Sequence, residues 1–240
     1  MRGAMIAREH LGTARIPGGD ELKLYRHDRD FMIVLGHNEL MSTRKSGSEV
    51  ALATMPIERL KGRKGLRLLI GGYGMGFTLL AALEKLGPDA RITVAELVPG
   101  IIDWARGPMA EVAAGCLDDP RVTLVMEDVA DTILTAAAGG IPRFDAILLD
   151  VDNGPDGLVR EANDRIYSAK GLRQTKNALT PGGILAIWSA APDTVFSNRL
   201  KKNGYVVDEQ KVAARSNGKG PKHVIWFAVP GQADSASPGT

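Results

Sequence analysis

The chain has 240 residues, of which 44% are hydrophobic, and its 30 Lys and Arg against 28 Asp and Glu give a net charge of +2. These values are typical of a soluble globular protein and provide no electrostatic reason to expect nucleic acid or a membrane surface as partner. A single cysteine, Cys116, excludes an intramolecular disulfide and a Cys-rich zinc site. Neither a signal peptide nor a transmembrane segment is evident, so we expect a cytoplasmic protein.

Residues 1–62 are expected to form a small unit ahead of the main domain. A loosely ordered lead-in, residues 1–20, precedes three strand-like runs that predict an antiparallel β meander. These runs are Glu21–Arg26, Phe31–Leu35 and Glu39–Thr43. Ser46 or Ser48 can cap a following helix, Glu49–Leu60, in which Pro56 requires a kink or an early end.

From residue 63 to residue 230, apolar runs alternate with helical patterns, which predicts βα units and a mostly parallel sheet. The strands expected are Leu66–Ile70, Arg91–Glu96, Val122–Met126, Phe144–Asp150 and Gly183–Ser189. The helices expected are Phe77–Leu86, Pro99–Ala114, Val129–Ala138, about Asp164–Leu179, and Asp193–Asn203. Two further strands, Tyr205–Ala213 and His223–Val229, predict a closing antiparallel hairpin, and residues 231–240 a disordered tail. The hairpin favours an α/β fold of the class I S-adenosylmethionine (SAM) methyltransferase type, with a Rossmann-like seven-stranded sheet.

The glycine-rich turn after the first of these strands is the central motif. Its sequence is Gly71-Gly72-Tyr73-Gly74-Met75-Gly76, and the helical pattern starts at Phe77. Such a turn lets backbone N–H groups and a helix N-terminus approach the polar part of a nucleotide-like ligand. The third glycine of the dinucleotide fingerprint is missing, which favours a SAM-type cofactor over NAD.

Acidic residues follow the carboxyl ends of the next strands, where ligands bind in open α/β sheets. Glu96 lies about 20 residues after the turn, the spacing of an acid that binds ribose hydroxyls. Asp128 is placed to accept a hydrogen bond from an adenine amino group, and Asp150 ends the fourth strand. The expected cofactor site consists of Gly71, Gly72, Tyr73, Gly74, Gly76, Glu96, Leu97, Asp128, Val129 and Asp150.

Five sequence blocks together resemble the spermidine synthase family over about Leu35–Val229. They are IGGYGMG, VAEL, DPRVTLVMEDV, FDAILLDVDNGP and LTPGGILAIW. The resemblance implies a homodimer that binds decarboxylated SAM and transfers its aminopropyl group to putrescine. It also implies that the four glycines of the loop, with Glu96 and Asp128, contact the cofactor.

The sequence departs from the family pattern mostly on the acceptor side. The aspartate of the family's glycine loop, which helps to hold the cofactor amine, is replaced by Gly74. The family's D-x-x-D motif keeps Asp150, but its second position is Asn153, preceded by Asp152. Three further family positions, a Tyr-Gln pair, a Gln and a Phe-Tyr pair, correspond to Gly47-Ser48-Glu49, Trp188 and roughly Gly171-Leu172.

These departures favour a SAM-dependent methyltransferase that acts on a small-molecule acceptor. Without a loop aspartate, backbone N–H groups at a helix N-terminus suit the carboxylate of intact SAM. Asn153 can hydrogen-bond an acceptor but cannot take its proton. An aminopropyltransferase that uses Asp150 and Asp152, and a non-catalytic module that binds SAM or a nucleoside, stay open as alternatives.

Methyl transfer from a sulfonium requires alignment, and a base only when the acceptor arrives protonated. Asp150 and Asp152 are therefore the candidate catalytic residues, and Glu49, Asn153 and Trp188 are the candidate acceptor contacts. The same carboxylates suit Mg²⁺, but Trp188-Ser189 stands where a magnesium enzyme needs Asp-Asn, so we expect no metal. Asn153-Gly154-Pro155 differs from the motif of base-methylating enzymes, so we expect no nucleic-acid substrate.

Overall fold

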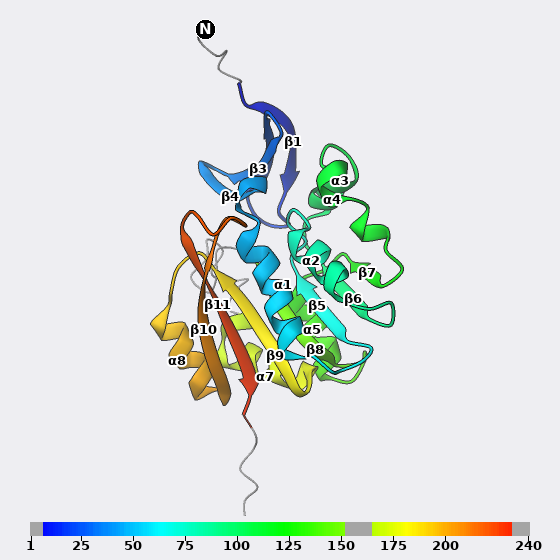
Figure 1. Ribbon diagram of the computed structural model, residues 1–240, viewed down its shortest axis with the longest axis vertical. Coiled ribbons are helices and arrows are strands. Elements are labelled where there is room, and N and C mark those ends of the chain that lie inside the picture. The colour runs from blue at the N-terminus through cyan, green and yellow to red at the C-terminus, as the bar shows by residue number, and fades with distance from the viewer. Residues whose placement is uncertain (1–6, 152–164, 232–240) are drawn as a thin grey trace, which may run out of the picture.

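The computed structural model describes residues 7–151 and 165–231, which form two sheets with helices (Figure 1). A four-stranded antiparallel sheet has the order β1-β2-β3-β4, and a seven-stranded sheet has the order β10-β11-β9-β8-β5-β6-β7. In Figure 1 the small sheet lies above one end of the large sheet, next to α3. No helix in the described part of the chain has the length and apolar character needed to cross a membrane.

The small sheet contains the predicted meander and one strand more. Its strands are β1 (Glu9–Arg15), β2 (Glu21–His27), β3 (Asp30–Leu35) and β4 (Asn38–Ser42). The expectation of a loose lead-in over residues 1–20 is thus wrong for β1, which pairs with β2 and packs on α3. Close packing explains why a weakly apolar segment is ordered, since a Cβ added at Gly12 would lie 2.8 Å from Trp104 Nε1.

A short 3-10 turn, η1 (Thr43–Lys45), leads into helix α1 (Gly47–Arg59). Neither serine caps α1 as predicted: the Ser46 side chain makes no cap hydrogen bond, and Ser48 lies inside the helix. Pro56 occupies the last turn, and the helix ends three residues later. Helix α1 packs on α2 and on the large sheet, so it contacts residues on the other side of the predicted domain boundary at residue 62. The division of the chain at this residue stays a prediction.

The large sheet confirms the predicted fold. Its strands are β5 (Arg67–Gly71), β6 (Arg91–Ala95), β7 (Val122–Val125), β8 (Phe144–Leu149), β9 (Leu179–Ser189), β10 (Tyr205–Ala213) and β11 (Lys222–Pro230). Neighbouring strands from β9 to β7 pair in parallel, whereas β11 pairs antiparallel with both β9 and β10. The closing hairpin therefore inserts its second strand beside β9.

Two predicted helices are interrupted. The helices that follow α1 are α2 (Phe77–Lys85), α3 (Pro99–Arg106), α4 (Ala110–Ala113), α5 (Val129–Ala137), α7 (Ala169–Ala178) and α8 (Thr194–Lys202), with the 3-10 turn η2 (Cys116–Asp118) after α4. The single helix expected over Pro99–Ala114 breaks at Gly107-Pro108, because proline disfavours helical geometry in the preceding residue. The Ser168 side chain accepts a hydrogen bond from Gly171 N and caps α7, which separates it from the helical residues 165–167.

The core lies on both faces of the large sheet. Alternate residues of β5 point to opposite faces, so Leu68 and Ile70 pack with α1, α2 and the small sheet, while Leu69 packs with α5, α7 and α8. Figure 1 shows α1 and α2 in front of the sheet. This arrangement places α1 and the small sheet over the carboxyl end of β5, where the glycine turn begins.

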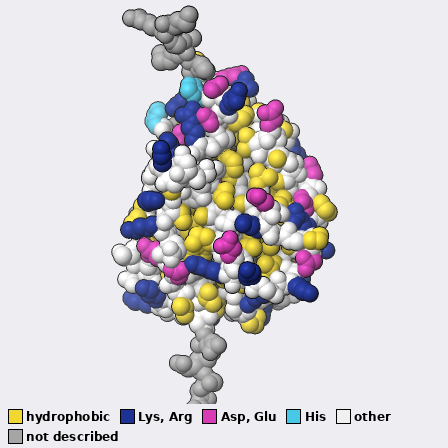
Figure 2. All heavy atoms as spheres, viewed as in Figure 1, with side chains coloured by type: hydrophobic (Ala, Val, Ile, Leu, Met, Phe, Trp, Pro, Cys, Tyr) yellow, Lys and Arg dark blue, Asp and Glu magenta, His cyan; other side chains and the backbone are white. Residues whose placement is uncertain are grey.

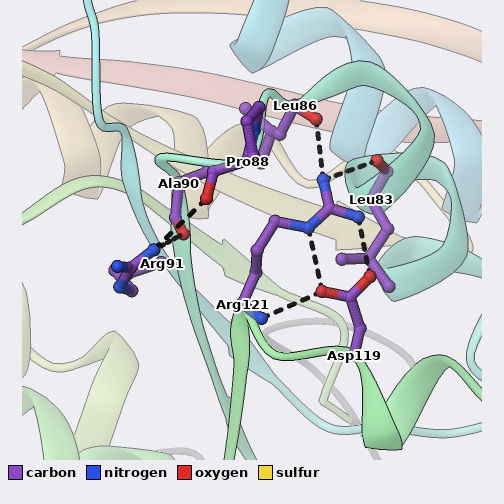
Figure 3. A network of polar contacts seen from close by, with 7 residues as sticks. All are labelled: Leu83, Leu86, Pro88, Ala90, Arg91, Asp119 and Arg121. Atoms are coloured by element: carbon purple, nitrogen blue, oxygen red, sulfur yellow. Dashed lines mark hydrogen bonds and ion pairs between the residues drawn. The ribbon is translucent and has the colours of Figure 1, made fainter.

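A polar network fixes the end of α2 (Figure 3). Arg121, just before β7, forms two parallel hydrogen bonds with Asp119, of 2.9 and 2.8 Å. The remaining Arg121 nitrogen donates to the carbonyl oxygens of Leu83 and Leu86, at 3.0 and 2.7 Å. Hydrogen bonding to Arg121 lowers the pKa of Asp119 to about 2. Two carbonyl oxygens at the C-terminal end of α2 are thus hydrogen-bonded to the residue that precedes β7.

Candidate functional site

A pocket opens between the small sheet, α1 and the carboxyl edge of the large sheet. The volume open to the centres of water molecules is about 190 Å³. Its described wall consists of Ile16, Leu22, Leu40, Met41, Ser48, Glu49, Gly72, Gly74, Ala95, Glu96, Leu97, Val98, Ile101, Glu127, Asp128, Val129, Asp150, Val151, Ile166 and Trp188. The sequence prediction that strand ends β5, β6, β7 and β8 share one site is consistent with this wall.

The glycine turn has the backbone that its glycines were expected to provide. Gly72, Gly74 and Gly76 have φ of 83°, 57° and 84°. A Cβ at Gly72 would lie 2.8 Å from the Asp150 carbonyl oxygen, so the turn can pass β8 only without a side chain. Helix α2 follows with Gly76 as its N-cap and no side-chain cap, which leaves its first N–H groups open to a ligand.

Tyr73 lies behind the turn instead of in the pocket. Its side chain is buried, and its hydroxyl lies 3.4 Å from Cys116 Sγ. A Cβ at Gly76 would lie 2.6 Å from the same hydroxyl. Tyr73, Gly71 and Gly76 are not among the residues of the pocket wall, and their predicted contacts with the cofactor stay predictions.

Glu96 joins the glycine turn to the start of α3. Its two carboxylate oxygens accept hydrogen bonds from Tyr73 N and Val98 N, each at 2.8 Å. Burial raises the pKa of Glu96, and the backbone donors partly oppose that shift. The backbone N–H groups of Leu97 and Gly74 also act on this carboxylate, so the predicted hydrogen bonds from ribose hydroxyls would share its oxygens with backbone donors.

Asp128 caps helix α5 at the far end of the pocket. One oxygen accepts from Ala130 N at 2.8 Å, and the other pairs with Arg165 at 2.8 Å. Arg165 pairs with Asp131 as well. No sequence spacing pointed to Arg165, which lies 37 residues after Asp128. The predicted adenine contact of Asp128 must therefore use a lone pair that these partners leave free.

Two acidic residues come from neighbouring elements of the pocket wall: Glu49 is in the first turn of α1, and Asp150 directly follows β8. Both are half-buried and line the pocket. Burial raises the pKa of Asp150 to about 7. The pKa of Glu49 is raised by burial and by the negative charge of Asp150. Two carboxylates in one poorly hydrated space favour a shared proton or a bound cation.

The described wall of the pocket carries negative charge. Its described wall contains five acidic side chains, Glu49, Glu96, Glu127, Asp128 and Asp150, and no Lys, Arg or His. The small sheet adds the apolar side chains Ile16, Leu22, Leu40 and Met41. A Cβ at Gly74 would lie 3.1 Å from Met41 Sδ, so Met41 covers the position where the family has a loop aspartate. The described wall is thus suited to a ligand that combines positive charge with apolar surface.

Trp188 forms part of the wall and belongs to a buried polar cluster. Its Nε1 donates to Ser48 Oγ at 2.9 Å, and Ser48 Oγ lies 2.8 Å from His223 Nδ1. Sequence reasoning treated Ser48 as a capping residue and His223 as a strand residue. No local signal could connect them, because 175 residues separate them in the chain.

The remaining predicted residues divide into two groups. Glu49, Gly72, Gly74, Glu96, Leu97, Asp128, Val129, Asp150 and Trp188 all line the pocket, while Asp152 and Asn153 lie outside the described residues. Within residues 7–151 and 165–231, no group of three or more His, Cys, Asp or Glu side chains is arranged to hold a metal ion.

Known proteins resemble this chain in both sequence and fold. The chain is 35% identical over 146 residues to a polyamine aminopropyltransferase of Mycobacterium tuberculosis, covering 58% of this chain and 27% of the relative. It is 28% identical over 164 residues to putrescine N-methyltransferase 4 of Nicotiana tabacum, covering 68% and 38%. The chain thus spans between about a quarter and two fifths of the length of these relatives. No protein-family model matches it.

Solved structures show the same fold. Spermidine synthase from Thermotoga maritima aligns with a TM-score of 0.72 at 17% identity, over 93% of this chain and 73% of that one. Human methyltransferase-like protein 13, in complex with SAH, aligns with a TM-score of 0.58 at 20% identity, over 81% and 85%. The fold is therefore that of class I SAM methyltransferases and spermidine synthases. The resemblance to spermidine synthases that the sequence blocks indicated is confirmed.

Proposed function

We propose that this protein is a SAM-dependent methyltransferase that acts on a small amine. The observation that carries the proposal is the position of Gly74. No carboxylate projects from the glycine turn, Met41 covers this position, and the first N–H groups of α2 have no side-chain cap. These features suit the carboxylate of intact SAM. Glu96 and Asp128 would bind ribose and adenine, and a structural neighbour named as a methyltransferase binds SAH.

The amine class of the acceptor is supported by Glu49 and Asp150. An ammonium ion placed between them would neutralise two carboxylates that otherwise repel each other. Burial raises the pKa of Asp150 to about 7 in the unliganded protein, and in this proposal its carboxylate is the base that takes a proton from the ammonium ion. The free amine attacks the methyl carbon of SAM, a C–N bond forms, and the C–S electrons return to sulfur to give S-adenosylhomocysteine.

Aminopropyl transfer is the second candidate, and the charge of the pocket favours it. Decarboxylated SAM has no negative group, and the described wall has five acidic side chains and no basic one. A relative at 35% identity is named for this reaction. In this case the amine would attack the aminopropyl carbon, and methylthioadenosine would leave.

Calorimetry with the two cofactors, followed by product analysis with putrescine, separates these candidates. Methyl transfer requires tighter binding of intact SAM and release of S-adenosylhomocysteine. Preference for decarboxylated SAM with release of methylthioadenosine would overturn the first candidate in favour of the second. Binding of either cofactor without turnover of any amine would contradict both.

The proposal also includes a cytoplasmic homodimer, as the family resemblance implies. Figure 2 shows hydrophobic atoms in the middle of the viewed face, bordered by charged side chains. Helices α1 and α2 lie at the front of this view (Figure 1), and both carry partly buried apolar residues. Sedimentation velocity should give about twice the chain mass of 25.6 kDa.

A further inference from the structure

The first turn of α1 is attached to the closing hairpin by buried contacts. Gly47 N donates to the Ala214 carbonyl oxygen at 2.9 Å. One residue later, Ser48 Oγ lies 2.8 Å from His223 Nδ1, on β11. A Cβ at Gly47 would lie 2.5 Å from the Arg215 carbonyl carbon, so the two segments are in close contact. The orientation of the first turn of α1 therefore depends on the hairpin.

Ser48 Oγ connects the two rings of this cluster. Trp188 Nε1 can only donate, so Ser48 Oγ accepts from it at 2.9 Å. This leaves the Ser48 hydrogen available to His223 Nδ1 in the neutral tautomer that carries its proton on Nε2. Burial and the charge of Lys45 lower the pKa of His223, which favours this neutral form. The Trp188 and His223 rings also meet edge to face, with centroids 4.7 Å apart.

This cluster lies directly behind the part of the pocket assigned to the acceptor. Ser48 and Trp188 line the pocket, but His223 does not. Glu49 is the next residue after Ser48, so a shift of the first turn of α1 would move its carboxylate. The cofactor contacts, by contrast, are on the glycine turn and after β6 and β7. The cluster is thus placed to affect acceptor binding separately from cofactor binding.

We propose that His223 is a positioning residue of the acceptor side, which acts through Ser48 to hold the Trp188 indole and the first turn of α1, with Glu49, in place. The inference rests on the proposed function, because that function puts the acceptor beside Glu49, Asp150 and Trp188. It adds a residue from the last strand of the sheet to the determinants of acceptor binding.

The chain offers a matched control on the opposite face of the sheet. Trp226 Nε1 donates to Ser197 Oγ at 2.7 Å, and both residues are buried. Neither residue lines the pocket. Ser197→Ala therefore removes a serine–tryptophan hydrogen bond away from the acceptor. It also removes the Ser197 donor to Glu209 at 2.8 Å, while Trp226 Nε1 keeps Glu209 as an acceptor at 3.0 Å.

The experiment compares His223→Phe, Ser48→Ala, His223→Asn and the Ser197→Ala control, with putrescine as the amine probe. Phenylalanine cannot accept the Ser48 hydrogen, whereas the asparagine amide oxygen can. Measurements are the KM and kcat for putrescine, the Kd of SAM by calorimetry, and the ¹⁹F resonance of Trp188 in protein labelled with 5-fluorotryptophan. Trp188→Phe assigns that resonance among the three tryptophans.

His223→Phe and Ser48→Ala should raise the KM for putrescine about tenfold, a loss of about 1.4 kcal/mol, and shift the Trp188 resonance. The Kd of SAM should change less than about twofold. His223→Asn should restore the KM, and Ser197→Ala should leave both KM and the Trp188 resonance unchanged.

An unchanged Trp188 resonance in His223→Phe and Ser48→Ala would overturn the inference. Equal losses of SAM and putrescine affinity, or the same KM effect in Ser197→Ala, would overturn it too, because the role would then be general stability. If the wild-type protein neither binds nor methylates putrescine, the proposed amine acceptor loses its support. The Trp188 resonance and the Kd of SAM then decide the role of His223 independently.

Discussion

Asp150 is the residue whose protonation state should control the reaction. Burial raises its pKa to about 7, so the side chain is ionised, and can accept a proton, only above that pH. The kcat/KM, which reports the pKa values of the free enzyme, should therefore rise as the pH increases through about 7 and then level off. Asp150→Asn removes the base and should lower kcat by about 100-fold or more, without that inflection. A pH–rate profile of both proteins checks this, and an inflection that persists in Asp150→Asn would contradict it.

Gly74 should decide which cofactor is preferred. Aspartate tolerates the left-handed backbone at φ 57°, and its carboxylate would face the end of the cofactor beside α2. Gly74→Asp should weaken binding of intact SAM and strengthen binding of decarboxylated SAM, each about tenfold, which calorimetry measures. Gly36→Asp is the matched control, because Gly36 has φ 58° and nothing within 4 Å of an added Cβ. Equal effects of the two variants would contradict this role of Gly74.

Among single residues, those that directly follow the strand ends could be assigned to the pocket from the sequence. The carboxyl ends of parallel strands converge at one edge of a sheet, so the order of the strands was enough to place Glu96, Asp128 and Asp150 together. The contacts of Ser48, His223 and Arg165 were not predicted. Their contacts join segments that are far apart in the chain, and those contacts exist only after the sheet has formed.

A single methyl group added at Gly76, in the turn between β5 and α2, should destabilise the protein. In Gly76→Ala the new Cβ meets the buried Tyr73 hydroxyl at 2.6 Å. The expected cost is about 2 kcal/mol of unfolding free energy, together with a loss of SAM affinity. Gly139→Ala has nearly the same φ, 82°, and open space around the Cβ, so it measures the backbone cost alone. Urea denaturation compares the two, and equal losses would refute the role of Tyr73.

At the C-terminal end of α2, the Arg121 side chain binds carbonyl oxygens of the helix (Figure 3). Arg121→Met removes the donors to the Leu83 and Leu86 carbonyl oxygens, and it leaves Asp119 with only the backbone N of residue 121 from this network. The Tm should fall by about 3 °C. Arg91→Met is the control: Arg91 donates only to neighbouring backbone, at Ala90 and Pro88, so the loss should be smaller. Calorimetric Tm values for the two variants test the difference.

Element boundaries were harder to predict than the elements themselves. The periodic patterns gave the strands of the large sheet and α2 and α5 within a few residues. Helix breaks at Pro108 and Ser168 were missed because apolar periodicity continues across them. Strand β1 was missed because its order depends on packing against α3, which the local sequence does not encode.

For the whole molecule, the acidic pocket should make stability depend on pH. The folded pKa of Asp150, about 7, exceeds its usual value of 3.8, so the folded state holds a proton that the unfolded state loses between these values. Stability should therefore fall as the pH rises from about 4 to about 7. Asp150→Asn should be more stable than wild type at pH 8, by about 1 kcal/mol or more, and nearly equal at pH 4. Denaturation curves at the two pH values that show no such difference would contradict this account.

At the same scale, the sequence was sufficient for the fold and for the strand ends that border the pocket, while the position of the cofactor stays a prediction. Alternation of strands and helices, followed by a hairpin, defines the seven-stranded sheet. The role of the small sheet as a wall of the pocket was not foreseen, since Ile16, Leu22, Leu40 and Met41 show their function only once the sheet is docked.

The position of β11 has a consequence for the order in which the protein can be made. It is the last strand in the described part of the chain, yet it lies inside the sheet, between β9 and β10. Strand β10 has no partner in the large sheet until Lys222–Pro230 has left the ribosome and entered the gap. The same strand brings His223 to Ser48, which is synthesised 175 residues earlier. During translation, Ser48 and Trp188 on the pocket wall therefore lack their support from β11 until Lys222–Pro230 has entered the sheet.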